Sequence, residues 1–248
     1  MTDTALPIDA ADTPTKGAPP EARIYKHRLP TRLWHWVNAV SVIIMIGSGL
    51  MIFNAHPRLY WGEYGANLDA AWLELPRFPG WTTIPESYNL ALGRRWHLFF
   101  ALILAFNLLA FMIVSLVNGH FLRDLRIRAA ELSPSHLWYD VKQHWAFRFH
   151  DPAQPGAFNI LQKLAYASAI FILLPLVIFT GLALSPGINA AWPWLIEVFG
   201  GRQSARSLHF IAMAAIAGFV VVHLALVILA GPINEVRSMI TGRWKVPH

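Results

Sequence analysis

The sequence predicts an all-α integral membrane protein, a four-transmembrane-helix bundle with both termini cytoplasmic. Of its 248 residues, 55% carry apolar side chains and only 14% are charged, and the mean hydropathy is +0.41. Such a composition is too hydrophobic for an ordinary soluble domain. Four apolar runs reach the roughly 20 residues that a helix needs to cross a ~30 Å hydrocarbon core. Fourteen of the 20 Lys and Arg residues fall in the segments that four spans leave on one side, which indicates that this side is cytoplasmic.

The chain begins with a polar segment that is rich in Pro and Ala and partly acidic. It lacks the basic start and the short apolar core of a secretory signal, so we expect residues 1–22 to form a disordered tail. We expect residues 23–243 to form the four-helix domain and residues 244–248 to form a short C-terminal tail.

Composition also excludes several kinds of site and partner. The chain has no cysteine, which excludes disulfides, thiolate-bound iron–sulfur clusters and the covalent attachment of c-type haem. The formal net charge is +6, but the basic residues flank the apolar runs instead of clustering on one face. We therefore expect contact with the lipid bilayer and no nucleic-acid partner.

The four predicted spans are each long enough to cross a membrane and contain no acidic residue, and they cover residues 33–53, 96–117, 160–184 and 208–230. Pro175 should kink the third span, because proline removes a backbone donor. The outer loop between the first two spans carries five aromatic rings: Tyr60, Trp61, Tyr64, Trp72 and Trp81. These rings suit either an aromatic belt at headgroup level or the surface of a partner protein.

Four of the eleven histidines fall inside the predicted spans, and they are His35, His97, His209 and His223. Ionisable groups are costly in the hydrocarbon zone, so each is a candidate functional residue. The alternating direction of the spans places His35 and His223 near the cytoplasmic face. It places His97 and His209 near the outer face.

The spacing within the fourth span makes this set specific. Fourteen residues separate His209 from His223, which is roughly 21 Å along a helix and within about 40° of one face. That helix can therefore offer one ligand to His97 at the outer level and another to His35 at the inner level. Two bis-histidine haems b stacked across a membrane need this arrangement.

Other readings of the histidines fit less well. A single intramembrane histidine is often a hydrogen-bonded packing residue, but four that pair by depth are harder to explain in that way. Zinc needs three or four ligands at one level. A proton relay usually includes Asp or Glu, and the four spans contain none. A haem-free transporter with structural histidines stays open as an alternative, and a colourless membrane extract would favour it.

Several residues near the candidate ligands could contact the cofactor. Four arginines lie within three residues of a candidate ligand, namely Arg32, Arg94, Arg95 and Arg206. They could bind haem propionates or could simply be the positive flanks of the spans. Gly49 lies 14 residues after His35, where a missing side chain could admit a macrocycle or allow close helix packing.

Several sequence features belong together: the stretches "HRLPTRLWHWVNAV", "GLMIFNAHPRLYWG", "RRWHLFFA" and "FNILQKLAY", and the H-x13-H spacing of the last span. Together they resemble the bacterial di-haem cytochrome b561 family, the membrane cytochrome b subunits of nickel–iron hydrogenases, formate dehydrogenases and related molybdenum enzymes. The similarity covers about residues 24–243. It implies that the four histidines bind two haems b, in the pairing that depth also indicates.

The resemblance also covers Asn159, Gln162 and Lys163 at the start of the third span. In the cytochrome subunit of formate dehydrogenase the quinone lies beside the matching Asn and near the inner haem. This implies a quinone pocket around Asn159 and His223, although this chain has Leu161 where a glycine lines that pocket. The residues alone are equally consistent with Asn159 capping the helix and Lys163 reaching the interface.

The function that the resemblance implies is electron transfer between a periplasmic molybdenum or nickel–iron oxidoreductase subunit and the membrane quinone pool. The chain would then be the quinone-reactive subunit of an oxidoreductase complex, and haem and quinone would carry the redox chemistry. The alternative is a stand-alone quinone oxidoreductase in which a small molecule such as superoxide reacts at the outer face.

Overall fold

The computed structural model describes residues 23–146 and 158–245, so the predicted N-terminal tail lies outside the described residues. Four helical segments in the described part are long and apolar enough to cross a membrane. They are α1 (Leu29–Phe53), α2 (Leu90–Val117), the continuous run α5 (Ile160–Ser168), η3 (Ala169–Leu173) and α6 (Leu174–Leu184), and α9 (Arg202–Ala230). The protein is therefore an all-α, multi-pass membrane protein, as the composition predicts.

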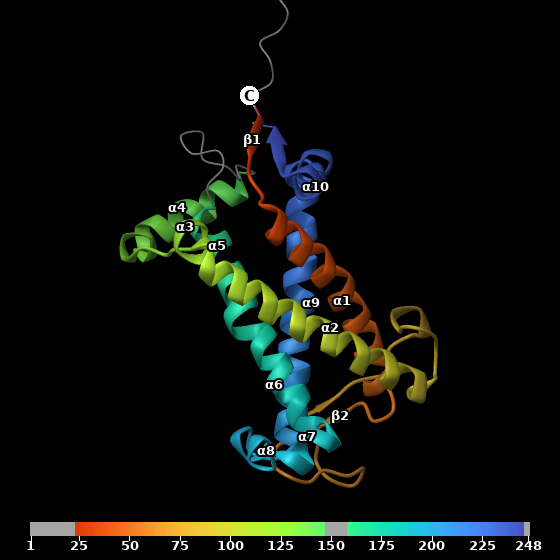
Figure 1. Cartoon of the computed structure of the whole chain (residues 1–248). Helices are drawn as coiled ribbons and strands as arrows, with labels where there is room; N and C mark the ends of the chain where they lie inside the picture. The colour runs from red at the N-terminus through yellow and green to blue at the C-terminus, as the bar shows by residue number, and fades with distance from the viewer. Residues whose placement is uncertain (1–22, 147–157, 246–248) are drawn as a thin grey trace, which may run out of the picture.

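Shorter elements cover the two ends of the bundle (Figure 1). We call one end terminal because it carries the first and last described strands, and the opposite end distal. The terminal end holds β1 (Arg23–Tyr25), α3 (His120–Asp124), η2 (Ala129–Leu132), α4 (Pro134–Trp145), α10 (Pro232–Thr241) and β4 (Arg243–Lys245). The distal end holds β2 (Arg58–Leu59), β3 (Leu73–Glu74), η1 (Gly80–Thr82), α7 (Pro186–Ala191) and α8 (Trp194–Val198).

Three of the long helices begin several residues before the predicted apolar runs. α1 starts at Leu29 because Pro30 occupies its first turn, where a missing backbone donor costs nothing. α2 starts after Asn89, whose side chain accepts a hydrogen bond from the backbone N–H of Leu92. The third span contains a π-helical segment, Ala169–Leu173, which ends two residues before Pro175. The helix is therefore irregular next to the proline, where the sequence predicts a kink.

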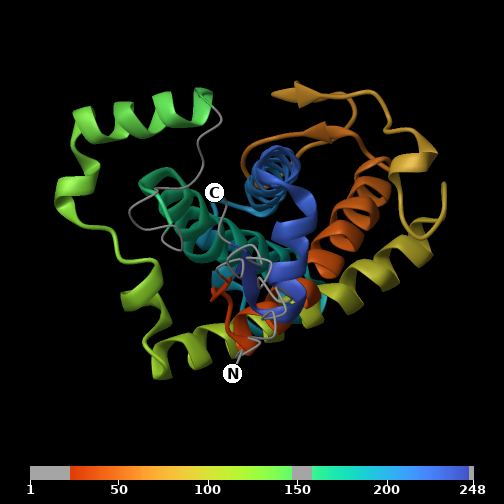
Figure 2. The ribbon, with the colours of Figure 1, turned by 90° about the horizontal axis from the view of Figure 1, so that it is seen from above.

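The long helices pack as two hairpins. The α1 and α2 backbones lie close together, as do those of α6 and α9. Among the described residues, close backbone contacts between α9 and either α1 or α2 are sparse by comparison. Seen from above, α9 stands between α1 on one side and α5 on the other (Figure 2). A seam therefore separates the α1–α2 hairpin from α9.

Apolar side chains bridge this seam at one level. Val42 of α1 and Leu104 of α2 join Leu174, Val177 and Ile216 of the second hairpin in one buried cluster. All five side chains are at most 8% exposed. We call this cluster the mid-level core.

At the terminal end the two ends of the described chain lie together. β1 pairs antiparallel with β4, with Ile24 opposite Trp244. The Trp244 ring is fully buried and its Nε1 donates to Oε1 of Glu235 at 2.8 Å. Trp244 and Lys245 thus belong to a strand, whereas the sequence suggested that the C-terminal tail begins at residue 244.

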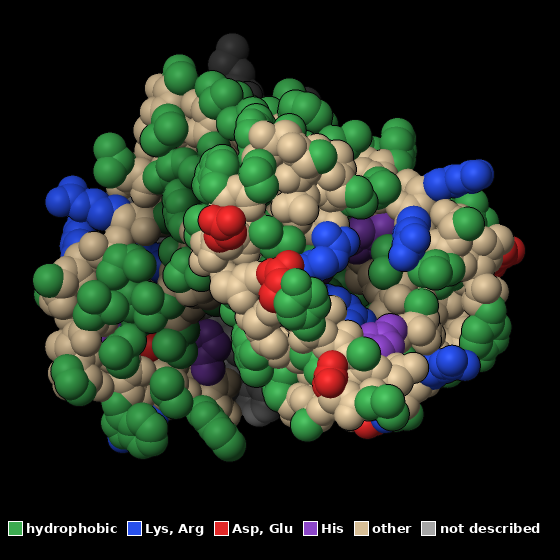
Figure 3. Space-filling model, turned by 90° about the horizontal axis from the view of Figure 1, so that it is seen from below, with side chains coloured by type: hydrophobic (Ala, Val, Ile, Leu, Met, Phe, Trp, Pro, Cys, Tyr) green, Lys and Arg blue, Asp and Glu red, His purple; other side chains and the backbone are tan. Residues whose placement is uncertain are grey.

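At the distal end the loop after α1 is fastened to the start of α9. Trp72 Nε1 donates to Oγ of Ser207 at 3.0 Å, and that hydroxyl donates to the backbone oxygen of Tyr60 at 2.6 Å. The Tyr60 side chain is buried, unlike the other four rings singled out in this loop. Hydrophobic side chains cover much of this end, with arginine and histidine side chains among them (Figure 3).

Candidate functional site

The four intramembrane histidines meet as two pairs. The ring centres of His97, on α2, and His209, on α9, are 6.2 Å apart with an interplanar angle of 62°. The ring centres of His35, on α1, and His223, on α9, are 6.3 Å apart at 60°. Both pairs thus span the seam between the α1–α2 hairpin and α9, and the two have nearly the same geometry.

The mid-level core lies between these pairs. Val42, Leu104 and Ile216 each lie seven residues from one of the histidines on the same helix. Seven residues correspond to about 10 Å of helix. Because α9 runs unbroken from Arg202 to Ala230, the two pairs are separated by roughly 21 Å along its axis.

A hydroxyl group contacts each imidazole of the distal pair. Oγ of Ser48, on α1, lies 3.0 Å from Nδ1 of His97. Oγ1 of Thr180, on α6, lies 3.0 Å from Nδ1 of His209. Both hydroxyl-bearing side chains are fully buried. The sequence analysis missed these two residues.

A glycine follows each of these hydroxyl residues. A Cβ added at Gly49 would lie 3.4 Å from Cε1 of His97, and one added at Gly181 would lie 3.2 Å from Cε1 of His209. Gly49 thus lies against the imidazole, which agrees with the close helix packing that the sequence offered as one explanation, and its contact with a macrocycle stays a prediction. One sequence signal could have revealed both contacts. It is a serine or threonine followed by glycine, in a span that packs against a span with a histidine.

The terminal pair has a different environment. Among the described residues, buried Nδ1 of His35 has no hydrogen-bond partner. Other buried polar atoms of α1 share this condition: Arg32 Nε, Asn38 Oδ1 and Ser41 Oγ. On the opposite helix the Phe219 ring stacks on His223, with ring centres 5.9 Å apart. Unpaired polar atoms are rare in protein interiors, so this stretch of α1 suits a further group.

A cavity borders the distal pair. His97 and His209 line it together with mid-level residues and two methionines, Met45 and Met213. No group of three or more His, Asp or Glu side chains in the described part of the chain could hold a metal ion. The described site therefore offers imidazoles in pairs, whereas zinc needs three or four ligands at one level.

The arginines predicted to contact haem propionates have different surroundings. Arg94 and Arg95 are exposed at the start of α2. The guanidinium of Arg206 donates to the backbone oxygen of Arg58 at 2.9 Å and also to the backbone oxygen of His56. Arg206 therefore fastens the distal loop, and its contact with a propionate stays a prediction, as does that of Arg32.

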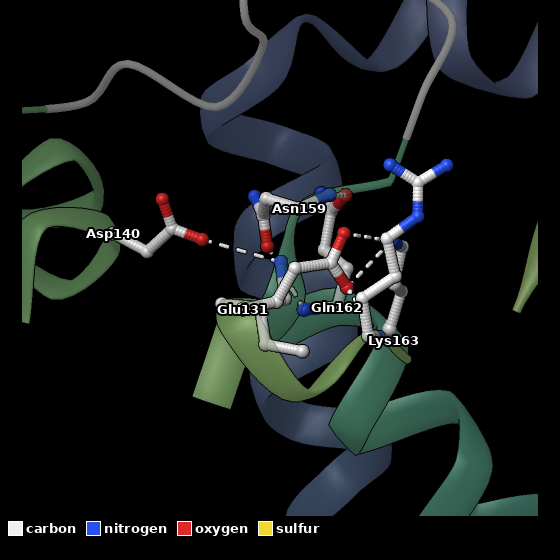
Figure 4. A network of polar contacts seen from close by, with 7 residues as sticks. Glu131, Asp140, Asn159, Gln162 and Lys163 are labelled. Carbon is white, nitrogen blue, oxygen red and sulfur yellow. Dashed lines mark hydrogen bonds and ion pairs between the residues drawn. The ribbon is translucent and has the colours of Figure 1, made fainter. Parts of the chain in front are cut away.

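Asn159 and Lys163 lie in a polar network at the terminal end (Figure 4). The Asn159 side chain caps α5 by accepting from the backbone N–H of Gln162 at 2.9 Å. Lys163 Nζ lies 2.9 Å from Oε1 and 3.0 Å from Oε2 of Glu131. Asp140 accepts from the backbone N–H of Ile160 at 3.2 Å, which ties α4 to α5.

This network agrees in part with the interpretation in which Asn159 caps the helix and Lys163 reaches the interface. Asn159 does cap the helix, and its Nδ2 also lies 3.4 Å from Nε2 of His144. Lys163 forms an ion pair in which its side chain is 15% exposed, so its charge is neutralised within the protein instead of at the interface. Neither contact tests the predicted quinone pocket.

Fold and site together define a class: a multi-pass membrane protein whose helices present paired imidazoles to one another inside the bundle. The family described as prokaryotic cytochrome b561 matches residues 26–242. The chain therefore belongs to the prokaryotic cytochrome b561 family. It is a membrane haem b protein with the role of an electron-transfer subunit.

Curated relatives agree with this assignment. A protein of Azospira oryzae named as a protein-methionine-sulfoxide reductase subunit, YedZ1, is 29% identical over 80% of this chain and 87% of its own length. Proteins named as Ni/Fe-hydrogenase B-type cytochrome subunits include one from Azotobacter vinelandii, 24% identical over 91% of this chain and 90% of its own. Another, from Cupriavidus necator, is 25% identical over 88% of this chain and 85% of its own. No solved structure matches the chain.

Proposed function

We propose that the protein holds two haems b, each between two histidines, and passes electrons between a periplasmic oxidoreductase subunit and the membrane quinone pool. The observation that carries the proposal is the pair of facing imidazoles at each of two levels. His97 and His209 would hold the distal haem, and His35 and His223 would hold the terminal one.

The geometry of the described residues fits such groups. Two imidazoles that share one ion, with metal–nitrogen bonds of about 2.0 Å, have ring centres roughly 6 Å apart. The separations in this protein are 6.2 Å and 6.3 Å. The open seam beside α9 and the unpaired polar atoms of α1 are features that a buried planar cofactor would fill and satisfy.

The protein's part in the chemistry is to bind, orient and insulate. Bound haem would supply a one-electron carrier at each level. The histidine rings fix where the two carriers lie, since all four sit on long membrane helices. The mid-level core lines the layer between them with apolar side chains.

The direction of the bundle in the membrane follows from its basic residues. β1 and β4 place the two ends of the described chain side by side, and most Lys and Arg residues belong to that end. Under the positive-inside rule the terminal end is cytoplasmic and the distal end periplasmic. In a bacterium this orientation corresponds to the inner membrane.

A partner at the distal end is supported by the names of the relatives and by exposed aromatic rings. Several relatives are named as subunits of Ni/Fe-hydrogenases, so a nickel–iron or molybdenum oxidoreductase subunit is the proposed partner. Trp61, Tyr64, Trp72 and Trp81 are 51%, 86%, 41% and 86% exposed on the loop that packs against α9. Aromatic rings are enriched at protein interfaces, and the same rings would also suit the headgroup region.

The quinone would bind at the terminal end, between the start of α5 and His223. Asn159 can donate through Nδ2, and Lys163 lies one turn further along the same helix. A quinone carbonyl accepts hydrogen bonds, so either side chain could contact it, if Lys163 exchanges one of its bonds to Glu131.

The test is the haem content of the purified full-length protein. We expect a reducible b-type spectrum and two haems per chain in the pyridine haemochrome assay. A short-chain quinone analogue such as decylubiquinone should oxidise the reduced haems. A value of one or zero haems would contradict the di-haem proposal. A colourless preparation would favour a transporter with structural histidines, and reduction by superoxide without a partner protein would favour the stand-alone oxidoreductase.

A further inference from the structure

The hydrogen bonds of Ser48 and Thr180 determine which way their protons point. Ser48 Oγ donates to the backbone oxygen of Ile44 at 2.7 Å, and Thr180 Oγ1 donates to that of Leu176 at 2.6 Å. A carbonyl oxygen can only accept, and a hydroxyl has one proton. Each hydroxyl proton is therefore used on the backbone of its own helix.

The same hydroxyl oxygens must then accept from the imidazoles. If Nδ1 of His97 or His209 were bare, two lone pairs would face each other at 3.0 Å. Both hydroxyls are 0% exposed, so water does not compete for these contacts. The arrangement places the ring proton of both histidines on Nδ1 and leaves Nε2 with its lone pair.

A glycine follows each hydroxyl residue and also lies against the imidazole. The Nδ1–Cε1 edge of each distal imidazole lies against a hydroxyl–glycine step, Ser48-Gly49 on α1 and Thr180-Gly181 on α6. The same device thus occurs twice, on different helices and for different histidines. At the terminal pair, Nδ1 of His35 has no such acceptor among the described residues.

We propose that Ser48 and Thr180 are positioning residues that hold His97 and His209 as Nε2 ligands and lower the reduction potential of the distal haem. The inference rests on the proposed function. Donation from Nδ1–H makes an imidazole a more basic ligand, which stabilises the more positive oxidised iron. A hydroxyl that already donates to a carbonyl is a better acceptor, because hydrogen bonds in a chain polarise one another.

The experiment is a redox titration of the full-length protein in detergent, monitored by optical and low-spin ferric EPR spectra. Ser48→Ala and the near-isosteric Thr180→Val should each raise the potential of one haem and move its EPR signal. We expect a change of up to about tenfold in the one-electron equilibrium constant, which is ~59 mV. The other haem should keep its potential. The conservative variants Ser48→Thr and Thr180→Ser keep the hydroxyl and should have the wild-type reduction potentials at both haems.

The matched control is Ser115→Ala, which removes a buried hydroxyl from α2 at the terminal end. It should leave the distal potential unchanged. Variants that keep two haems with unchanged potentials, or with equal shifts in both, would overturn the inference while leaving the di-haem proposal intact. If Ser48→Ala loses the distal haem, Thr180→Val decides. A wild-type preparation with fewer than two haems would instead overturn the proposed function.

Discussion

Nη1 of Arg206 lies 2.9 Å from the backbone oxygen of Arg58, which joins the first turns of α9 to the loop that follows α1. A second bond from the same guanidinium reaches the backbone oxygen of His56. The two bonds use the two terminal nitrogens of one planar guanidinium, a fork that the single ammonium nitrogen of lysine does not reproduce. Together with the bonds through Ser207, this side chain, three residues from His209, holds the distal loop against α9.

Replacing Arg206 by Ala should loosen this loop. Two backbone oxygens would lose their donor, at a cost of about 1–3 kcal/mol. We expect faster amide hydrogen exchange at residues 58–62 and unchanged exchange in β1 and β4. Arg202→Ala is the matched control, since within the described residues that guanidinium makes one long bond, 3.4 Å, to the backbone oxygen of Leu184. Equal exchange in both variants would show that Arg206 does not fasten the loop.

Replacing His35 by Ala should remove the terminal haem and leave the distal one bound. The reason is that the distal pair, His97 and His209, lies about 21 Å away along α9, and His35 is not one of its two histidines. Pyridine haemochrome should fall from two haems per chain to one. His136→Ala, at an exposed position of α4, should retain both. Loss of the distal haem alone from the His35 variant would overturn the pairing.

Replacing Gly181 by Ala should disturb the distal site. The new Cβ would lie 3.2 Å from Cε1 of His209, closer than ordinary packing allows, and overpacking of this kind costs about 1–3 kcal/mol. We expect a lower melting temperature and a broadened distal haem spectrum. Gly218→Ala serves as the control, because a Cβ there would meet no atom within 4 Å. Similar behaviour of the two variants would argue against close contact at Gly181.

The ion pair between Glu131 and Lys163 should make stability depend on pH. Burial alone raises the pKa of Glu131, but hydrogen bonds from Lys163 and from the Arg128 backbone, with the charges of both residues, bring the pKa below its usual value. A lowered carboxyl pKa stabilises the fold above the unfolded value of about 4.3, and this contribution is lost as pH falls through the folded pKa.

Thermal melting from pH 7 to pH 3.5 checks this sign. The free energy of unfolding of the wild type should exceed that of Glu131→Gln by on the order of 1 kcal/mol near neutral pH. This difference should shrink below about pH 4.3. Glu197→Gln, at an exposed distal position, should follow the wild-type curve. A difference that grew on acidification would contradict the assigned direction.

The sequence predicts the four spans and the levels of the histidines because both depend on local properties. Hydrophobic length identifies each helix, and a rise of 1.5 Å per residue sets the depth of each histidine. The resulting pairs, His35 with His223 and His97 with His209, are the ones whose rings the structure brings together.

Contacts that depend on how helices rotate and loops fold could not be predicted in this way. Which face of α1 meets α2 decides that Ser48 reaches His97, and the hydrophobic pattern does not specify that rotation. Likewise, Lys163 meets Glu131 only because the segment after α2 folds back over α5. Tyr60 is buried because its loop turns onto α9, whereas an aromatic ring in an outer loop suggests exposure.

The mid-level core also bears on what can leak through the bundle. Val42, Leu104 and Ile216 line the layer between the two histidine levels, and the four membrane segments contain no Asp or Glu. A proton therefore finds no carboxylate in that layer, and a bare charge there would be strongly disfavoured. A respiratory membrane stores energy as a proton gradient, so a protein that passes electrons between its two faces, as we propose for this one, must not also conduct ions. A layer lined by apolar side chains and free of carboxylates meets that requirement.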